Sequence, residues 1–264
     1  MSQIDLKSGG FLLELGTIVL STKRLKFGMN VVSVALRDPL LLAKQCATVD
    51  FLSNGRILPA FGVGSNFSPE WKATNLSTKG RGLRTDEGLE IISRLWAEES
   101  VNFQGKYFQY ENVRINPKPV QKLLPLWLGG ASEAAIRRTA KYGTGWIAGL
   151  NSPKETAPVI AAIKKAVKEE GRHIDDDHYG AGFFYRFGSW DDDVCKAKID
   201  GYARLTGKDP RNYLAVGDAG DILKRIRQFV KAGAEKFVLL PIAAGVEDTL
   251  DQTRFLINEV LSEF

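Results

Sequence analysis

Short apolar runs alternate with amphipathic stretches along most of the chain. Within each amphipathic stretch, apolar residues recur with the spacing of one helix face. Strands that alternate with helices predict a parallel sheet whose strands are buried on both sides, so the sequence indicates an α/β fold. The predicted strands are FGMNVV (27–32), ILPAFGV (57–63), PLWLGG (125–130), GWIAGL (145–150), GAGFFYRFG (180–188) and KFVLLPIA (236–243).

Capping residues indicate where the helices begin. Asp38 and Pro39 are expected to open one helix, because both residue types are typical of a first turn. Thr85 is expected to cap the amphipathic helix of residues 85–100. We interpret the carboxylates of RTDEGLE (84–90) as structural, since acids at a helix N-terminus stabilise its dipole. Further elements are expected as helices over residues 11–20, 133–141, 152–171, 192–205 and 219–232, and as a hairpin within residues 101–121.

No linker or internal repeat divides the chain, so one domain over residues 1–264 is expected. Residues 66–84 are polar and rich in Gly, Ser and Thr, and we interpret residues 66–124 as an insertion into that domain. The six predicted strands supply two strand–helix units fewer than an eightfold barrel requires.

The composition is ordinary for a globular protein with a substantial core, with 44% hydrophobic and 25% charged residues. No apolar stretch approaches the ~18 to 20 residues that a membrane span needs. The polar start MSQIDLKSGG lacks the features of a secretory signal peptide. We therefore expect a cytoplasmic protein that does not associate with membranes.

Charge and the rare residue types narrow the function classes further. The net charge is +5, but basic residues are interleaved with acids, so nucleic-acid binding is not expected and a small anionic ligand fits the excess equally well. Cys46 and Cys195 are expected to be buried thiols rather than a disulfide or a metal site. His173 and His178 are the only histidines, which excludes a histidine-rich metal cluster.

Ligands of parallel α/β proteins bind beyond the carboxyl ends of the strands. LWLGGAS (126–132) ends a strand and starts a helix, where amide groups and the helix dipole favour an anion and glycines let it approach. GVGSN (62–66) is similar, although it matches neither a dinucleotide fingerprint nor a P-loop. From the residues alone, each turn is either a phosphate site or merely a tight turn. The strand-end candidates are residues 30–33, 64–68, 129–132, 148–151, 188 and 241–245.

Several segments of the chain, taken together in their order along the sequence, form a specific pattern. LAKQCATVDFLSNGRILPAFGVGSNFSPEW combines a helix containing Ala-Thr-hydrophobic-Asp, a Ser-x-Gly-Arg turn and a Gly-hydrophobic-Gly turn. The segments that follow it along the chain are RGLRTDEGLEIISRLW, FQGKYFQYENVRINPKPVQ, PLWLGGASEAAIRRTAKYGTGW and VGDAGDILKRIRQFVKAGAEKFVL. From about residue 11 onward, this set resembles the luciferase-like flavin oxidoreductases. Thr144 stands where that family commonly has an acid in Gly-Asp-Gly-Trp.

The resemblance implies an α/β fold of the (β/α)8 TIM-barrel type, here with about six strands and therefore incomplete at its N-terminal end. It also implies FMN or coenzyme F420, a 5-deazaflavin, bound at the carboxyl face of the barrel. A non-proline cis peptide in the family's third strand corresponds to Asn30-Val31. Ser65 and Asn66 match the turn that touches the isoalloxazine-type ring. The residues that match the phosphate-binding region are Gly129, Gly130, Ala131 and Ser132.

The resemblance favours a flavin-class oxidoreductase that transfers hydride to or from a small organic substrate, with F420 preferred over FMN. An FMN-dependent monooxygenase, a non-catalytic flavin-binding barrel and a phosphate-binding barrel of unrelated chemistry remain as alternatives. No catalytic residue and no metal ligand is assigned, and a homodimer is expected because dimers are usual in the family.

Overall fold

The protein is described by a computed structural model, which covers residues 11–263 in detail. The chain divides into two compact units, Met1–Gly145 (unit 1) and Trp146–Phe264 (unit 2). The expectation of one domain over residues 1–264, with an insertion at 66–124, stays a prediction. Within the described residues, no helix has the length and apolar character needed to cross a membrane.

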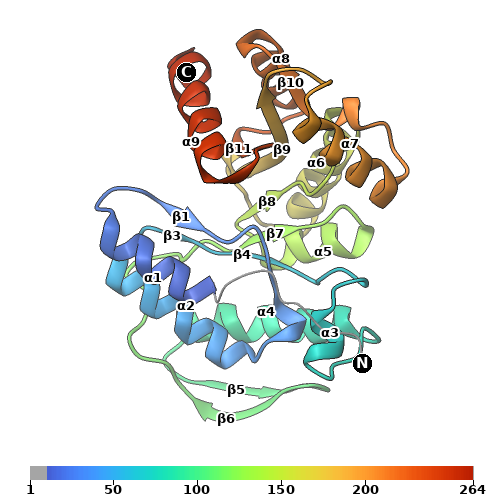
Figure 1. The fold of residues 1–264 in the computed structure, drawn as a ribbon. Helices are drawn as coiled ribbons and strands as arrows, with labels where there is room; N and C mark the ends of the chain where they lie inside the picture. Colours follow the sequence, from blue (N-terminus) through green and yellow to red (C-terminus); the bar gives the residue numbers. More distant parts are fainter. Residues whose placement is uncertain (1–10, 264) are drawn as a thin grey trace. The chain divides into compact units, whose positions relative to one another are not determined.

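Unit 1 alternates strands and helices as the apolar pattern predicts (Figure 1). In chain order its elements are α1 (Phe11–Ser21), β1 (Phe27–Gly28), β2 (Val32–Ser33), the 3-10 turn η1 (Val34–Leu36), α2 (Pro39–Ser53), β3 (Ile57–Leu58), β4 (Ala60–Gly62), α3 (Glu70–Ala73), α4 (Arg81–Ala97), β5 (Val101–Gln104), β6 (Gln109–Val113), β7 (Trp127–Gly129) and α5 (Glu133–Tyr142).

The first two predicted strands are each split into two short strands. The strand expected at 27–32 forms β1 and β2, and a cis peptide bond joins Asn30 to Val31 between them. The strand expected at 57–63 forms β3 and β4, separated by Pro59, which lacks the N–H that a continuous ladder needs. β1 pairs with β3, and β2, β4 and β7 pair in that order, all in parallel.

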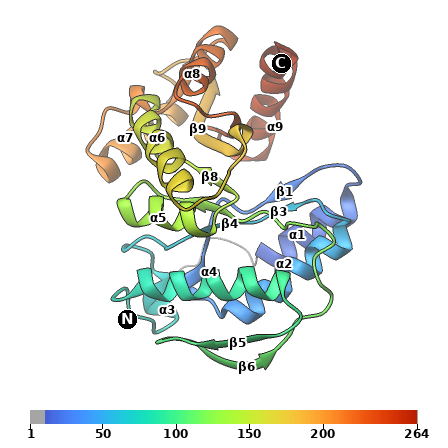
Figure 2. The same cartoon turned by 180° about the vertical axis from the view of Figure 1, so that it is seen from behind.

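Helices α1, α2 and α4 lie on one side of β1, β3 and β4, and the β5–β6 hairpin lies beyond them (Figures 1 and 2). The predicted start of α2 is confirmed, because the Asp38 side chain accepts a hydrogen bond from the Leu41 N–H and Pro39 is the first helical residue. The predicted hairpin is also confirmed.

The predicted start of α4 is wrong. The helix begins at Arg81, after Gly80 in the left-handed conformation with φ of 77°, so Thr85 lies in its second turn and not at its cap. The Arg84 side chain, in the added first turn, donates to the Ala35 carbonyl at 2.9 Å, a contact remote in sequence. The hydroxyl of Thr85 is buried and has no hydrogen-bond partner among the described residues.

Two buried carboxylates hold unit 1 together. Glu87 in α4 accepts hydrogen bonds from the backbone N–H groups of Lys106, Tyr107 and Phe108, and so fixes the turn of the β5–β6 hairpin. Its role is structural, as expected, but it does not act at the helix N-terminus. Asp50, at the end of α2, is fully buried and binds the segment that leads into β7.

Unit 2 contains, in chain order, β8 (Gly145–Ile147, which begins at the last residue of unit 1), α6 (Pro153–Glu169), the 3-10 turn η2 (Asp176–His178), β9 (Tyr179–Phe187), α7 (Asp193–Thr206), the 3-10 turn η3 (Pro210–Asn212), β10 (Ala215–Gly217), α8 (Ala219–Lys231), β11 (Lys236–Pro241), α9 (Gly245–Phe255), the π-helical turn η4 (Leu256–Val260) and the 3-10 turn η5 (Leu261–Glu263).

Strand β9 is the centre of unit 2, because β8, β10 and β11 all pair with it in parallel. One face of β9 packs on α8 and α9, as Phe183 stacks on Phe229 and Phe187 packs on Phe255. β10 was not expected from the sequence. The two cysteines, Cys46 in unit 1 and Cys195 in unit 2, are both buried and unbridged, as predicted.

The start of α6 carries a network that should make stability depend on pH. Ser152 and Glu155 form a capping box, and Glu155 also accepts hydrogen bonds from Lys208 (2.7 Å) and Tyr213 (3.0 Å). Burial alone would raise the pKa of Glu155, but the hydrogen bonds from Lys208, Ser152 and Tyr213 outweigh it and lower the pKa to about 2.

A carboxylate with a lowered pKa stabilises the folded state above its unfolded pKa, and this stabilisation is lost as pH falls through the folded value. We therefore expect Glu155→Gln to lower the melting temperature at pH 7, where the wild-type carboxylate is charged. The difference between the two proteins should shrink between the ordinary pKa of 4.5 and about 2. An equal difference at pH 7 and pH 2.5 in thermal denaturation would contradict this role of the charge.

Candidate functional site

Three parallel strands of unit 1 end at a common edge. Val32 and Ser33 of β2 are in register with Phe61 and Gly62 of β4, and Phe61 in turn is in register with Leu128 of β7. Since carboxyl ends of neighbouring parallel strands meet at the same edge of a sheet, the loops that leave β2, β4 and β7 start side by side. Five of the eight residues predicted to bind the cofactor lie on the loops after β4 and β7. Gly129 is the last residue of β7, and Asn30 and Val31 directly precede β2.

The cis peptide expected at Asn30-Val31 is present and directly precedes β2. Val31 is 39% exposed, and its side chain lies against Gly62, because a Cβ built on Gly62 would come within 2.8 Å of Val31 Cγ2. Only glycine at position 62 leaves room for Val31 in this place. The contact presents an apolar side chain to solvent at the carboxyl edge.

The turn after β4 is built around Gly64 and Ser65. Gly64 has φ of 85°, and a Cβ on it would lie 2.9 Å from the hydroxyl of Ser33 and 3.1 Å from the ring of Trp71. The buried Trp71 indole N–H donates to the Ser65 carbonyl at 2.8 Å and thereby holds the turn in place. The side chains of Ser65 and Asn66 are thereby left exposed.

The turn after β7 leads directly into α5. Gly130 has φ of 109°, a conformation that other residues rarely adopt, and a Cβ there would lie 3.0 Å from Ala135 Cβ. Ser132 is the N-cap of α5, and its hydroxyl accepts a hydrogen bond from the Ala135 N–H at 3.3 Å. Gly130, Ala131 and Ser132 are exposed, so the turn before α5 lies at the surface.

The structure thus brings Val31 together with the turn after β4, and it places the turn after β7 on the same edge. Asn66 and Ala131 are exposed, and their roles stay predictions. Glu133, the first residue of α5, lies 3.8 Å from Arg137, and its carboxylate is almost fully exposed.

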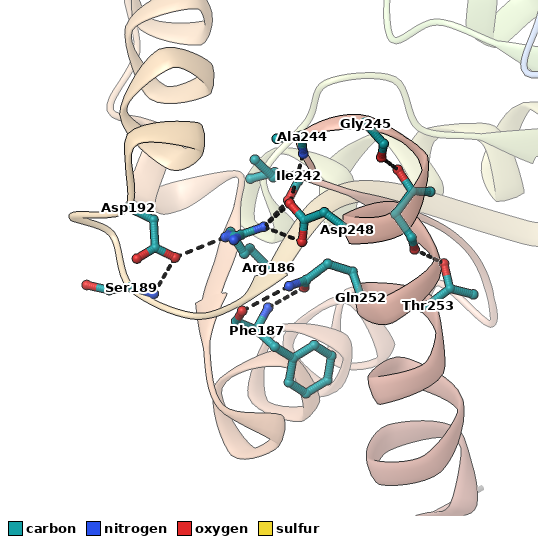
Figure 3. A network of polar contacts seen from close by, with 11 residues as sticks. Arg186, Phe187, Ser189, Asp192, Ile242, Ala244, Gly245, Asp248, Gln252 and Thr253 are labelled. Atoms are coloured by element: carbon teal, nitrogen blue, oxygen red, sulfur yellow. Dashed lines mark hydrogen bonds and ion pairs between the residues drawn. The ribbon is translucent and has the colours of Figure 1, made fainter.

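A second polar cluster, at the carboxyl end of β9 in unit 2, was missed by the sequence analysis (Figure 3). The Arg186 guanidinium lies 3.0 Å from the carboxylate of Asp192 and 2.9 Å from that of Asp248, and it also donates to the Ile242 carbonyl. Gln252 binds both the N–H and the carbonyl of Phe187. Arg186 holds the pKa of Asp192 below its usual value.

This cluster joins β9 to the loop before α7 and to the first turn of α9 (Figure 3). Two carboxylates neutralise the Arg186 charge, so the geometry fits a structural connection rather than a cation awaiting an anionic ligand. The sequence signal for this cluster was Arg186, a charged residue in the otherwise apolar run GAGFFYRFG.

A family model described as luciferase-like monooxygenase matches residues 11–205. The chain belongs to this family. An uncharacterized protein of Mycobacterium tuberculosis is 32% identical over 152 residues, which cover 57% of this chain and 51% of that protein. The F420-dependent glucose-6-phosphate dehydrogenase of Amycolatopsis mediterranei is 26% identical over 164 residues, covering 59% and 48% of the two chains. The chain therefore spans about half the length of the curated relatives it matches.

Solved structures of a dehydrogenase and of a monooxygenase share the fold. An F420-dependent secondary alcohol dehydrogenase in complex with an F420–acetone adduct superposes with a TM-score of 0.83 at 20% identity, over 97% of this chain and 84% of that one. A monooxygenase from Streptomyces bottropensis superposes with a TM-score of 0.82 at 19% identity, over 96% and 82%. The expected α/β fold of the TIM-barrel type is confirmed.

Proposed function

We propose that this luciferase-like chain binds a flavin-type cofactor, F420 or FMN, and acts as an oxidoreductase on a small organic substrate. The observation that carries the proposal is the carboxyl edge of unit 1, where the exposed Val31, the Ser65-Asn66 turn and the glycine turn before α5 come from three neighbouring strands. The family match and the F420-dependent relative support the cofactor class.

The residues at this edge fit such a cofactor. Gly62 and Gly64 have no side chains, and a Cβ at either position would collide with Val31 or Ser33. Val31 offers an apolar surface for a ring, and the side chains of Ser65 and Asn66 offer hydrogen-bonding groups for the ring's polar edge. The exposed turn before α5, at the positive end of the helix dipole, suits a phosphate.

The chain's own residues would bind and orient the reacting groups. Ser132 keeps the start of α5 in place through its cap, and Gly130 allows an anion to approach the backbone. Trp71 fixes the turn that carries Ser65. The cofactor supplies the two-electron chemistry when bound, and the protein supplies position and surroundings.

Hydride transfer with F420 is the preferred reaction, because both a sequence relative and a structural neighbour are F420-dependent dehydrogenases. An FMN-dependent monooxygenase is the second candidate, favoured by the monooxygenase structure. A flavin-binding chain without catalysis is the third candidate.

Titration of the purified protein with F420 and, separately, with FMN tests the proposal. We expect saturable quenching of tryptophan fluorescence by one cofactor, followed by turnover of alcohols, carbonyls or enones with F420, or oxygen uptake with reduced FMN. Binding without turnover would favour the non-catalytic candidate. Failure of both cofactors to bind would overturn the proposal. The cytoplasmic location and the homodimer stay predictions, and analytical ultracentrifugation tests the latter.

A further inference from the structure

A cleft of about 910 Å3 lies within unit 2, between the start of α6, the turn η3 and α8. Its volume is in the range of small-molecule sites, which is ~300 to 1,000 Å3. Its wall is rich in cations: Lys154 comes from α6, Arg211 from η3, and Arg225 and Lys231 from α8. Glu155 is the one carboxylate of the lining.

The positive charges of this cleft are not balanced by nearby acids. Among the residues that the structure describes, none of the four cations forms an ion pair with a carboxylate. Glu155 is already engaged by Lys208 outside the lining, at 2.7 Å, and by the N-cap of its own helix. The cleft therefore keeps an excess of positive charge, and an anion placed there would relieve the repulsion between its cations.

The inner wall of the cleft is held in place by Arg225. Its guanidinium, partly shielded from solvent, donates to the carbonyls of Arg211 (2.7 Å), Asn212 (2.6 Å) and Leu214 (3.1 Å). Carbonyls position a guanidinium without neutralising it, and burial lowers the pKa of Arg225. Arg225 thereby holds η3 against α8 and places an immobile positive charge at their contact.

The other cations lie around this wall and reach solvent. Arg211 stacks over the ring of Trp190 at 5.3 Å, an arrangement that restricts its side chain while leaving the guanidinium edge available. Lys154 and Lys231 are exposed. The arrangement combines one fixed charge with three charges able to close on a ligand, which suits a polyanion better than a single carboxylate.

We propose that this cleft binds a small ligand carrying at least two negative charges, through phosphate or carboxylate groups. The site belongs to unit 2, whereas every residue proposed to hold the flavin-type cofactor belongs to unit 1. The inference therefore does not depend on the proposed function.

Isothermal titration calorimetry of the purified protein with tripolyphosphate and with citrate tests this inference. We expect saturable binding of one tripolyphosphate per chain, weakened about tenfold or more by Lys231→Ala and by Arg211→Ala. Lys224→Ala is the matched control, because Lys224 is an exposed lysine of α8 outside the cleft. It should bind like wild type, and thermal melting confirms that each variant folds.

The two ligands separate the two chemistries. Tight binding of tripolyphosphate with weak binding of citrate would identify a phosphate compound as the ligand, and similar affinities would identify a polyanion recognised by charge alone. The proposal is overturned if neither ligand binds saturably, or if both cleft variants bind as wild type does. It is also overturned if a single-stranded RNA binds far more tightly than tripolyphosphate and competes with it.

Discussion

Replacing Gly130 with aspartate is expected to lower the affinity for the flavin-type cofactor about 100-fold, the equivalent of about 2.7 kcal/mol. Gly130 has φ of 109°, so any side chain there strains the backbone, and its Cβ would press on Ala135. The added carboxylate would also repel a phosphate at the start of α5. Fluorescence titration with the cofactor that binds the wild type measures the loss.

Gly171→Asp is the matched control for this substitution. Gly171 also has a positive φ, of 66°, but it follows α6 and no other atom lies within 4 Å of a Cβ placed on it. We expect Gly171→Asp to bind the cofactor as wild type does. A Gly130→Asp protein that is folded and retains wild-type affinity would show that the phosphate does not lie at the turn after β7.

Asp50→Ala is expected to lower the free energy of unfolding by about 3 kcal/mol. The fully buried carboxylate of Asp50 accepts hydrogen bonds from the N–H of Val120 (2.7 Å), the N–H of Gln121 (3.0 Å) and the side-chain amide of Gln121 (2.7 Å). Alanine would remove the acceptor of two partly shielded backbone N–H groups and of one amide hydrogen of Gln121, at a cost of ~1 kcal/mol each. The Gln121 amide keeps its other hydrogen bond, to the Ile57 carbonyl.

Urea denaturation of wild type, Asp50→Ala and Asp50→Asn measures this effect. Asparagine keeps the shape and one acceptor oxygen, so its loss should be clearly smaller than that of alanine. A change below ~1 kcal/mol for Asp50→Ala would mean that water or another group satisfies these donors.

Elements defined by neighbouring residues were predictable from the sequence. The start of α2 follows from Asp38 and Pro39, whose effects act within one helical turn. The start of α4 was not predictable, because its added first turn includes the contact of Arg84 with the remote Ala35 carbonyl. β10 was not predictable, because its three residues form a strand only through pairing with the end of β9.

The candidate site was likewise predictable only in part. The resemblance to a family located the turns and the cis peptide, but the contact of Val31 with Gly62 depends on the register of β2 and β4, which no local pattern encodes. The Arg186 cluster joins partners 6 and 62 residues away in the chain. The contact of Arg186 with Asp248 depends on the packing of α9 on β9.

The burial of both cysteines has a practical consequence for labelling. Burial raises the pKa of Cys46 to about 12, so almost no thiolate forms there at neutral pH. Burial also raises the pKa of Cys195. Maleimide dyes should therefore react slowly with the native protein. A single cysteine introduced at the exposed Lys224, which lies outside both proposed sites, would become the preferred attachment point for a fluorophore.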